Sequence, residues 1–113
     1  MSLSLHRSDY FWADLIRQVD WYRDEANPKV AERFVDAVET IFNALLKQPE
    51  IGRARFLNWP GLEGIRSFRV TKPFHRFLIF YRFDDSTLYA ERLIHGGRDL
   101  PRRLLESPSD EGS

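Results

Sequence analysis

The sequence predicts an α+β fold, in which an N-terminal strand and an α-helical hairpin pack on one face of an antiparallel β-sheet and a short C-terminal helix follows. Three observations predict it. Apolar residues recur at helical spacing between about residues 9 and 48. A single Asn-Pro break divides this stretch into two helices. From residue 64 onward the apolar period falls to two, which is typical of strands.

A short strand and the first helix open the chain. Residues 3–8 (LSLHRS) alternate briefly between apolar and polar side chains, which indicates a strand. Ser8 or Asp9 can then cap a helix that runs to about Glu25. The apolar stripe of this helix is formed by residues spaced three and four apart: Trp12, Leu15, Ile16, Val19 and Tyr22.

The second helix starts at the Asn-Pro break. Asn27 suits the N-cap and Pro28 the first helical position, and Pro49 ends the helix near Gln48. One face of this helix carries the apolar residues Val30, Phe34, Ala37, Val38, Ile41 and Leu45. Because the link between the two helices is very short, we expect them to pair antiparallel as a hairpin.

A Gly- and Pro-rich loop over residues 49–63 precedes three strands that we expect to form a meander. The predicted strands cover residues 64–70 (GIRSFRV), 73–83 (PFHRFLIFYRF) and 87–95 (TLYAERLIH). The turn signal DDS separates the last two strands.

The middle strand is apolar on both sides and therefore predicts a sheet that is covered on both faces. One face carries Phe77, Ile79, Tyr81 and Phe83, which form the natural core beneath the helices. The other mixes apolar and basic side chains: Phe74, Arg76, Leu78, Phe80 and Arg82. Since the two helices cover one face only, we expect the second face to be completed by the C-terminal segment, by a partner chain, or by both.

The composition of the 113-residue chain suits a single domain over residues 1–105, followed by an acidic tail (residues 106–113) that we expect to be disordered. Cysteine is absent, which excludes disulfides and thiolate metal sites. No apolar run approaches the length of a membrane span, and the N-terminus lacks the apolar segment of a signal peptide. The expected location is the cytoplasm.

The formal net charge is zero, but the charges are unevenly distributed. Residues 1–50 hold six Lys/Arg against nine Asp/Glu, whereas residues 51–105 hold eleven against five. Guanidinium groups match phosphate and carboxylate, so we expect the basic part to meet a polyanion or an acidic partner; the alternative is a mixed, solvated surface. The arginines on or next to the predicted strands are Arg66, Arg69, Arg76, Arg82, Arg92 and Arg98.

His95 ends the last predicted strand just before two glycines, at what we expect to be an open rim. There it could transfer a proton in catalysis, or only hydrogen-bond the backbone or Asp99 at the turn. The other two histidines have no ligand-type neighbours at suitable spacing, so no metal site is expected, and no cofactor motif is present. Asp99 could pair with Arg98, or it could cap a final helix in which Leu100, Leu104 and Leu105 pack back on the sheet while Arg102 and Arg103 face water.

Three stretches carry a resemblance to a known family: GLEGIRSFRV (Gly61–Val70), HRFLIFYRF (His75–Phe83) and RLIHGGRDL (Arg92–Leu100). The second helix with the Pro-x-x-Gly that follows it (residues 27–53) adds to them. In order and spacing they resemble the ParE/RelE superfamily, the toxins of type II toxin–antitoxin modules, and in particular the ParE-like plasmid-stabilisation proteins. The resemblance covers about residues 3–105 and implies a RelE/ParE-like fold.

The resemblance also implies partners and an activity. A cognate antitoxin would wrap the toxin, form a hetero-oligomer with it and neutralise it. ParE-like members poison DNA gyrase and arrest growth, whereas RelE-like members cut mRNA on the ribosome. Where RelE-like cleavage uses a C-terminal tyrosine, this chain has Leu100 and Pro101, which favours ParE-like action through binding. Two further hypotheses are a degenerate toxin and a non-toxic binding module.

The gyrase and nuclease hypotheses predict different site residues. For the gyrase-directed toxin, the residues expected to contact the target or the antitoxin are Arg66, Arg69, Arg76, Arg82, Arg92, Arg98, Leu100 and Leu104. For the RelE-like nuclease, the phosphate would be held by Arg66, Arg69 and Arg92, and a proton would be moved by His95.

Overall fold

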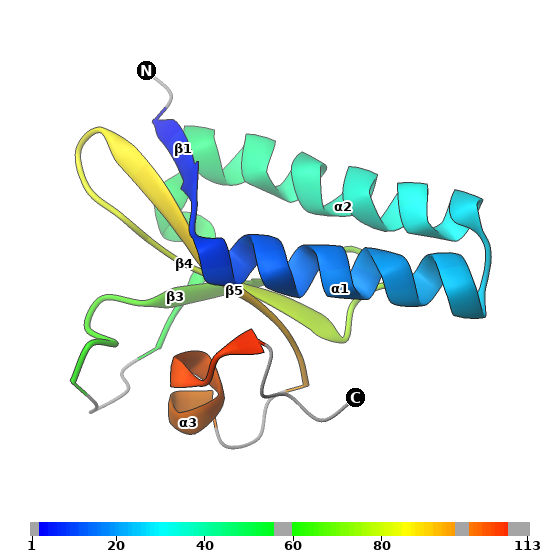
Figure 1. Cartoon of the computed structure of the whole chain (residues 1–113). Helices are drawn as coiled ribbons and strands as arrows, with labels where there is room; N and C mark the ends of the chain where they lie inside the picture. Colours follow the sequence, from blue (N-terminus) through cyan, green and yellow to red (C-terminus); the bar gives the residue numbers. More distant parts are fainter. Residues whose placement is uncertain (1–2, 56–59, 97–99, 109–113) are drawn as a thin grey trace.

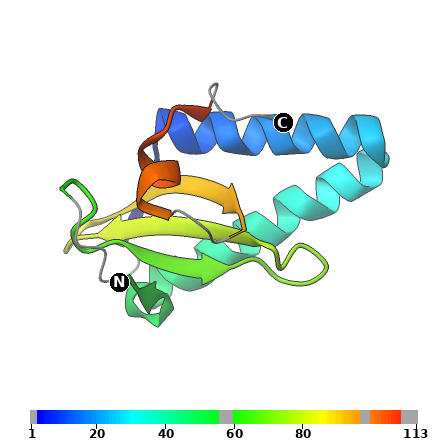
Figure 2. The same cartoon turned by 90° about the horizontal axis from the view of Figure 1, so that it is seen from below.

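The computed structural model describes residues 3–55, 60–96 and 100–108, and of Leu100 and Pro101 only the backbone. Two long helices cover one face of a five-stranded sheet, and a short helix lies on the other face (Figures 1 and 2). The strands are arranged in the order β1-β5-β4-β3-β2. In chain order the elements are β1 (Ser4–Arg7), α1 (Asp9–Glu25), α2 (Pro28–Lys47), the 3₁₀ turn η1 (Pro49–Ile51), β2 (Arg53–Ala54), β3 (Arg66–Arg69), β4 (Phe77–Phe83), β5 (Thr87–His95) and α3 (Leu100–Leu105).

The helical hairpin is confirmed, with both predicted caps in place. The side chains of Ser8 and Asn27 accept hydrogen bonds from the backbone N–H groups three residues later, each at 3.0 Å. The predicted stripe of α1 is shifted, however, because Phe11 enters the core and Trp12 does not. Trp12 and Ile16 are 41% and 56% exposed, so this helix leaves part of its apolar surface uncovered.

The sheet differs from the prediction in two respects. Strands β3 to β5 form the antiparallel meander that was expected, and β2 adds a short antiparallel strand beside β3. Strand β1 pairs with β5 in parallel, from Ser4 opposite Thr87 to Arg7 opposite Ala90. A parallel pair needs a long crossover, and the helical hairpin is part of the connection between the two strands. Strand β2 falls within the region that the composition predicted to be loop.

The main core lies between the helical hairpin and the sheet. Its fully buried large side chains include Phe11, Phe34, Phe42, Ile79 and Tyr81. The Tyr81 hydroxyl donates to the Pro49 carbonyl at 2.6 Å and accepts from the Gly52 N–H at 2.9 Å. Burial raises the pKa of Tyr81, so the hydroxyl stays protonated and fastens η1 and β2 to the core.

The second face of the sheet is closed by the chain itself. A smaller apolar cluster there joins Leu78 and Phe80 of β4 and Ile94 of β5 to side chains that cover them, those of Leu62, Ile65 and Leu104. Of the three covers that the sequence left open, the C-terminal segment is therefore confirmed, and the loop before β3 adds to it. Phe74 was expected on this face but packs in the main core, because β4 begins only at Phe77 and Phe74 lies in the preceding turn.

Ordered contacts continue past the boundary predicted at residue 105. The Arg17 guanidinium donates to the Pro108 carbonyl at 2.9 Å, which fastens Glu106–Pro108 to α1. The remainder of the predicted tail, residues 109–113, lies outside the described residues.

Candidate functional site

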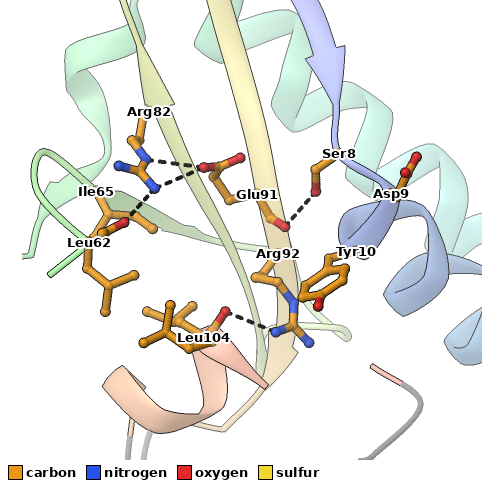
Figure 3. A pocket seen from close by; sticks show the side chains of 11 residues that line it. Ser8, Asp9, Tyr10, Leu62, Ile65, Arg82, Glu91, Arg92 and Leu104 are labelled. Carbon is orange, nitrogen blue, oxygen red and sulfur yellow. Dashed lines mark hydrogen bonds and ion pairs between the residues drawn. The ribbon is translucent and has the colours of Figure 1, made fainter. Parts of the chain in front are cut away.

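A pocket of about 390 Å³ opens on the second face of the sheet, between the start of α1, the loop before β3 and helix α3 (Figure 3). Three segments far apart in the sequence thus meet there. Its walls combine apolar and charged groups, which suits recognition of an amphipathic partner. The lining residues are Ser8, Asp9, Tyr10, Gly61, Leu62, Ile65, Arg82, Glu91, Arg92, Leu104 and Leu105.

The apolar wall of the pocket is formed by the cover of the second face. Leu62, Ile65 and Leu104 are each at most 5% exposed and rest on the apolar side chains of β4 and β5. Leu105 is different, because 46% of it is exposed at the pocket edge. Gly61 and Gly64 adopt φ values of 87° and 75°, a left-handed conformation that turns the chain sharply on either side of Leu62.

Arg82 forms the polar rim of the pocket. Its guanidinium pairs with Glu91 at 3.1 Å and donates to the carbonyl oxygens of Gly61 and Glu63 at 2.7 and 3.2 Å. The pairing of β4 with β5 shifts register next to Phe80, which leaves Glu91 as an extra residue in β5. Arg82 and Glu91 remain 33% and 29% exposed, so both can exchange their present contacts for those of a partner.

Arg92 is buried beside the pocket and fastens three elements together. Its Nε and Nη2 donate to the two carboxylate oxygens of Asp14, on α1, at 2.8 and 3.0 Å. Both side chains are at most 3% exposed. Its Nη1 donates to three carbonyl oxygens at the end of α3, those of Arg103, Leu104 and Glu106, at 2.9, 3.1 and 2.6 Å. Arg92 thus holds α3 against the sheet, and its charge is already neutralised.

Asp14 also satisfies the edge of the sheet. Strand β1 ends opposite Ala90, so the residues of β5 that follow Ala90 have no neighbour in β1. The Asp14 carboxylate accepts the Leu93 N–H at 3.0 Å, and Ser8 Oγ donates to the Glu91 carbonyl at 2.9 Å. The first turns of α1 therefore take over from β1 in closing this edge. Asp14 was not predicted from the sequence, where its only signal is an acidic residue next to the apolar stripe.

The residues predicted for phosphate binding do not converge. Arg66 lies opposite Tyr81 and therefore on the helix-covered face, where it donates to the Glu50 and Gly52 carbonyls at 3.1 and 2.9 Å. Arg69, three residues later, lies on the α3 side and donates to the His75 carbonyl. Arg92, the third, is enclosed by Asp14 and the carbonyls that end α3.

The other predicted residues are dispersed. Arg76 is exposed in the turn before β4. His95 is exposed at the end of β5, with its ring edge-on to Phe77 at 5.0 Å between centroids, and so away from the pocket. Leu104 packs on the sheet as expected and also lines the pocket. Arg98 and the side chain of Leu100 lie outside the described residues.

The described part of the chain contains neither a group of side chains suited to a metal ion nor a helix suited to crossing a membrane. Within residues 3–55, 60–96 and 100–108, no three His, Asp or Glu side chains gather where a metal ion could be held. No helix in the same ranges combines the length and apolarity that crossing a bilayer requires.

Comparisons with known proteins agree with this architecture. No curated protein matches the sequence. A solved chain from the chromosomal ParDE toxin–antitoxin system of P. aeruginosa shares the fold, with a TM-score of 0.68 and 20% sequence identity over 85% of this chain and 98% of that chain. The family model described as ParE toxin of the type II toxin–antitoxin system parDE matches residues 5–100. The chain therefore belongs to the ParE family of type II toxins.

Proposed function

We propose that this toxin is neutralised by a cognate antitoxin and arrests growth by inhibiting DNA gyrase. The observation that carries the proposal is the family match over residues 5–100, which spans nearly the whole sheet and both long helices. The fold shared with a chain of a ParDE system supports the same assignment.

The pocket beside α3 is the surface that we assign to the antitoxin. Its apolar wall would accept an aliphatic or aromatic side chain, since Leu62, Leu104 and the exposed Leu105 line it. An acidic residue of the antitoxin could then pair with Arg82, which is already oriented by two backbone carbonyls. A segment that alternates apolar and acidic side chains would satisfy both requirements.

The arrangement of the arginines supports inhibition by binding rather than by cleavage. A ribosome-dependent nuclease would need its phosphate-holding groups on one surface, close to the group that moves the proton. Here Arg66 and Arg69 project from opposite faces of β3, and Arg92 is buried. The three arginines that the RelE-like alternative names therefore do not share one surface.

The proposal is tested first with purified gyrase. The chain should block ATP-dependent supercoiling of relaxed plasmid, and addition of the cognate antitoxin should restore it. If gyrase is unaffected at saturating toxin while ribosome-bound mRNA is cut, the nuclease hypothesis is correct instead. If overproduction of the chain alone leaves growth unchanged, the non-toxic binding module is favoured.

The antitoxin surface has its own test. Leu105→Glu places a charge at the pocket edge on a residue that is already 46% exposed, so the fold should tolerate it. We expect antitoxin affinity to fall by more than about tenfold, as for a buried anchor at an interface. The matched control is Ile16→Glu, since Ile16 is 56% exposed and lies outside the pocket. Equal losses in the two variants would argue against the pocket.

A further inference from the structure

Three arginines outside the pocket, Arg53, Arg55 and Arg69, project from one face of β3 and of the segment that begins with β2. Arg53 lies directly opposite Ser67, and the Arg55 N–H donates to the Ile65 carbonyl at 2.9 Å, which continues the same register. Arg69 follows Ser67 by two residues. Because side chains alternate along a strand, the three arginines share the face that also carries Phe80.

Within residues 3–55, 60–96 and 100–108, no carboxylate pairs with the three guanidinium groups. Arg55 donates to Ser67 Oγ at 2.8 Å and lies 6.0 Å from the centre of the Phe80 ring. Arg69 donates to a backbone carbonyl, and Arg53 is exposed. Among the described residues, the ion pairs of arginine involve Arg7, Arg23, Arg82 and Arg92 but none of these three.

The charges of the cluster act on one another. Burial, together with the charges of Arg53 and Arg69, lowers the pKa of Arg55. The pKa of a guanidinium lies far above neutral pH to begin with, so Arg55 keeps its charge despite this lowering. Holding like charges together is unfavourable unless an anion binds among them.

The spacing of the cluster suits a chain of anions. Directly opposite residues on neighbouring strands are about 5 Å apart, and residues two apart along a strand are about 7 Å apart. Long side chains on such a grid can reach successive charges of a polyanion that crosses the sheet. None of the three lines the pocket beside α3, so the ligand would lie across the surface.

We propose that Arg53, Arg55 and Arg69 form a binding site for the phosphodiester backbone of DNA. An acidic peptide is a weaker fit, because peptides gain much of their affinity from apolar anchors, and the described apolar residues on this face, Ile65, Leu78 and Phe80, are buried. Phosphate contacts alone can carry nucleic-acid binding. The site goes beyond the gyrase proposal and can be measured without gyrase.

The test is fluorescence anisotropy of the purified 113-residue chain with a labelled DNA duplex of about 20 base pairs, over roughly 50–200 mM salt. The variant Arg53→Gln/Arg55→Gln/Arg69→Gln should weaken binding at least about tenfold at the lowest salt. It should also reduce the slope of log K against log salt by about 2 to 3, since each lost phosphate contact contributes about 0.9.

A matched control removes the same charge elsewhere. Arg23→Gln/Arg33→Gln/Lys47→Gln changes three exposed residues of the helical hairpin, and its affinity should stay within about threefold of the original chain. If the triple cluster variant fails to fold, Arg53→Gln alone should still lower the slope by about 1, because Arg53 makes no described side-chain bond.

Three outcomes would overturn the proposal. The original chain could fail to bind the duplex, or the cluster and hairpin variants could lose affinity equally, which would indicate a general charge effect. A poly-glutamate peptide of the same charge could bind as tightly as the duplex, which would assign the cluster to an acidic protein instead.

Discussion

The buried pair of Arg92 and Asp14 predicts a large loss of stability when one partner is removed. Asp14→Ala deletes the carboxylate that neutralises a guanidinium which is itself only 3% exposed. It also leaves the Leu93 N–H without its acceptor. Breaking a buried ion pair from one side costs about 3–5 kcal/mol, because the remaining charge stays buried and uncompensated.

This loss is a large share of the total, since a domain of this size is stable by about 5–15 kcal/mol. At roughly 4 °C per kcal/mol, the midpoint of thermal unfolding should fall by about 12–20 °C. Urea unfolding followed by circular dichroism measures the free energy directly. Hydrogen exchange of the α3 amides should also accelerate, because Arg92 fixes the end of that helix.

Two further variants make the test sharp. Asp20→Ala breaks the exposed pair with Arg23, whose side chains are about half accessible, and should cost less than about 0.5 kcal/mol. Asp14→Leu/Arg92→Met replaces both buried charges with apolar groups and should be more stable than Asp14→Ala. A loss of unfolding free energy below about 1 kcal/mol for Asp14→Ala would refute the reasoning. So would a double variant Asp14→Leu/Arg92→Met whose loss equals the sum of the losses for its two single substitutions.

Three other predictions concern single contacts. Gly52→Ala would place a Cβ in steric overlap with the ring and the hydroxyl of Tyr81 and should cost about 1–3 kcal/mol in urea unfolding; a loss unchanged in a Tyr81→Leu background, which lacks the ring, would contradict this steric cause. Hydrogen bonds from Ser86 lower the pKa of Asp84, so its contribution to stability should be present above about pH 4 and vanish as pH falls further; a thermal midpoint difference between the chain and Asp84→Ala that persists at pH 2 would refute it. Leu104→Ala should cost about 2–5 kcal/mol, and unchanged hydrogen exchange in α3 would show that this side chain does not hold the helix.

The sequence was most informative where local chemistry determines structure. The hairpin was predictable because Ser8 and Asn27 are good caps and because the apolar spacing of α2 matches one helical face. Strand β5 was predicted with its observed bounds, since a turn signal precedes it and glycine follows it. The start of β4 was predicted too early, because Phe74 fits the alternation of a strand although it lies in the turn before β4.

The direction of β1 and the covering of the second face depend on distant partners. Nothing near residues 3–8 specifies whether β1 runs parallel or antiparallel to a strand more than 80 residues away in the chain. Likewise, Leu62, Ile65 and Leu104 come from two loop-flanked segments whose meeting is a property of the whole fold. Local patterns can indicate that a face needs cover, but they do not identify which segment provides it.

The candidate site was harder to predict because some arginines of this chain hold the fold together, whereas others are available to a ligand. Arg92 lies 78 residues from the acid that neutralises it, so the sequence shows an apparently available cation where the structure has a buried ion pair. Arg66 and Arg82 are likewise engaged by backbone carbonyls: Arg66 by those of Glu50 and Gly52, and Arg82 by those of Gly61 and Glu63.

Arginines that are available for a ligand differ from those that the fold requires in how many internal acceptors surround them. A planar group with five donors can satisfy several carbonyls at once, so a small domain with long irregular segments gains stability by burying it. Such an arginine can bind a partner only if its internal acceptors are given up. Among the described residues, Arg53, Arg55 and Arg69 have few internal acceptors, and an anion bound among them would relieve their mutual repulsion. Counting basic residues therefore overstates the binding surface, and the arginines without an acid or several carbonyls around them are where an external polyanion would bind first.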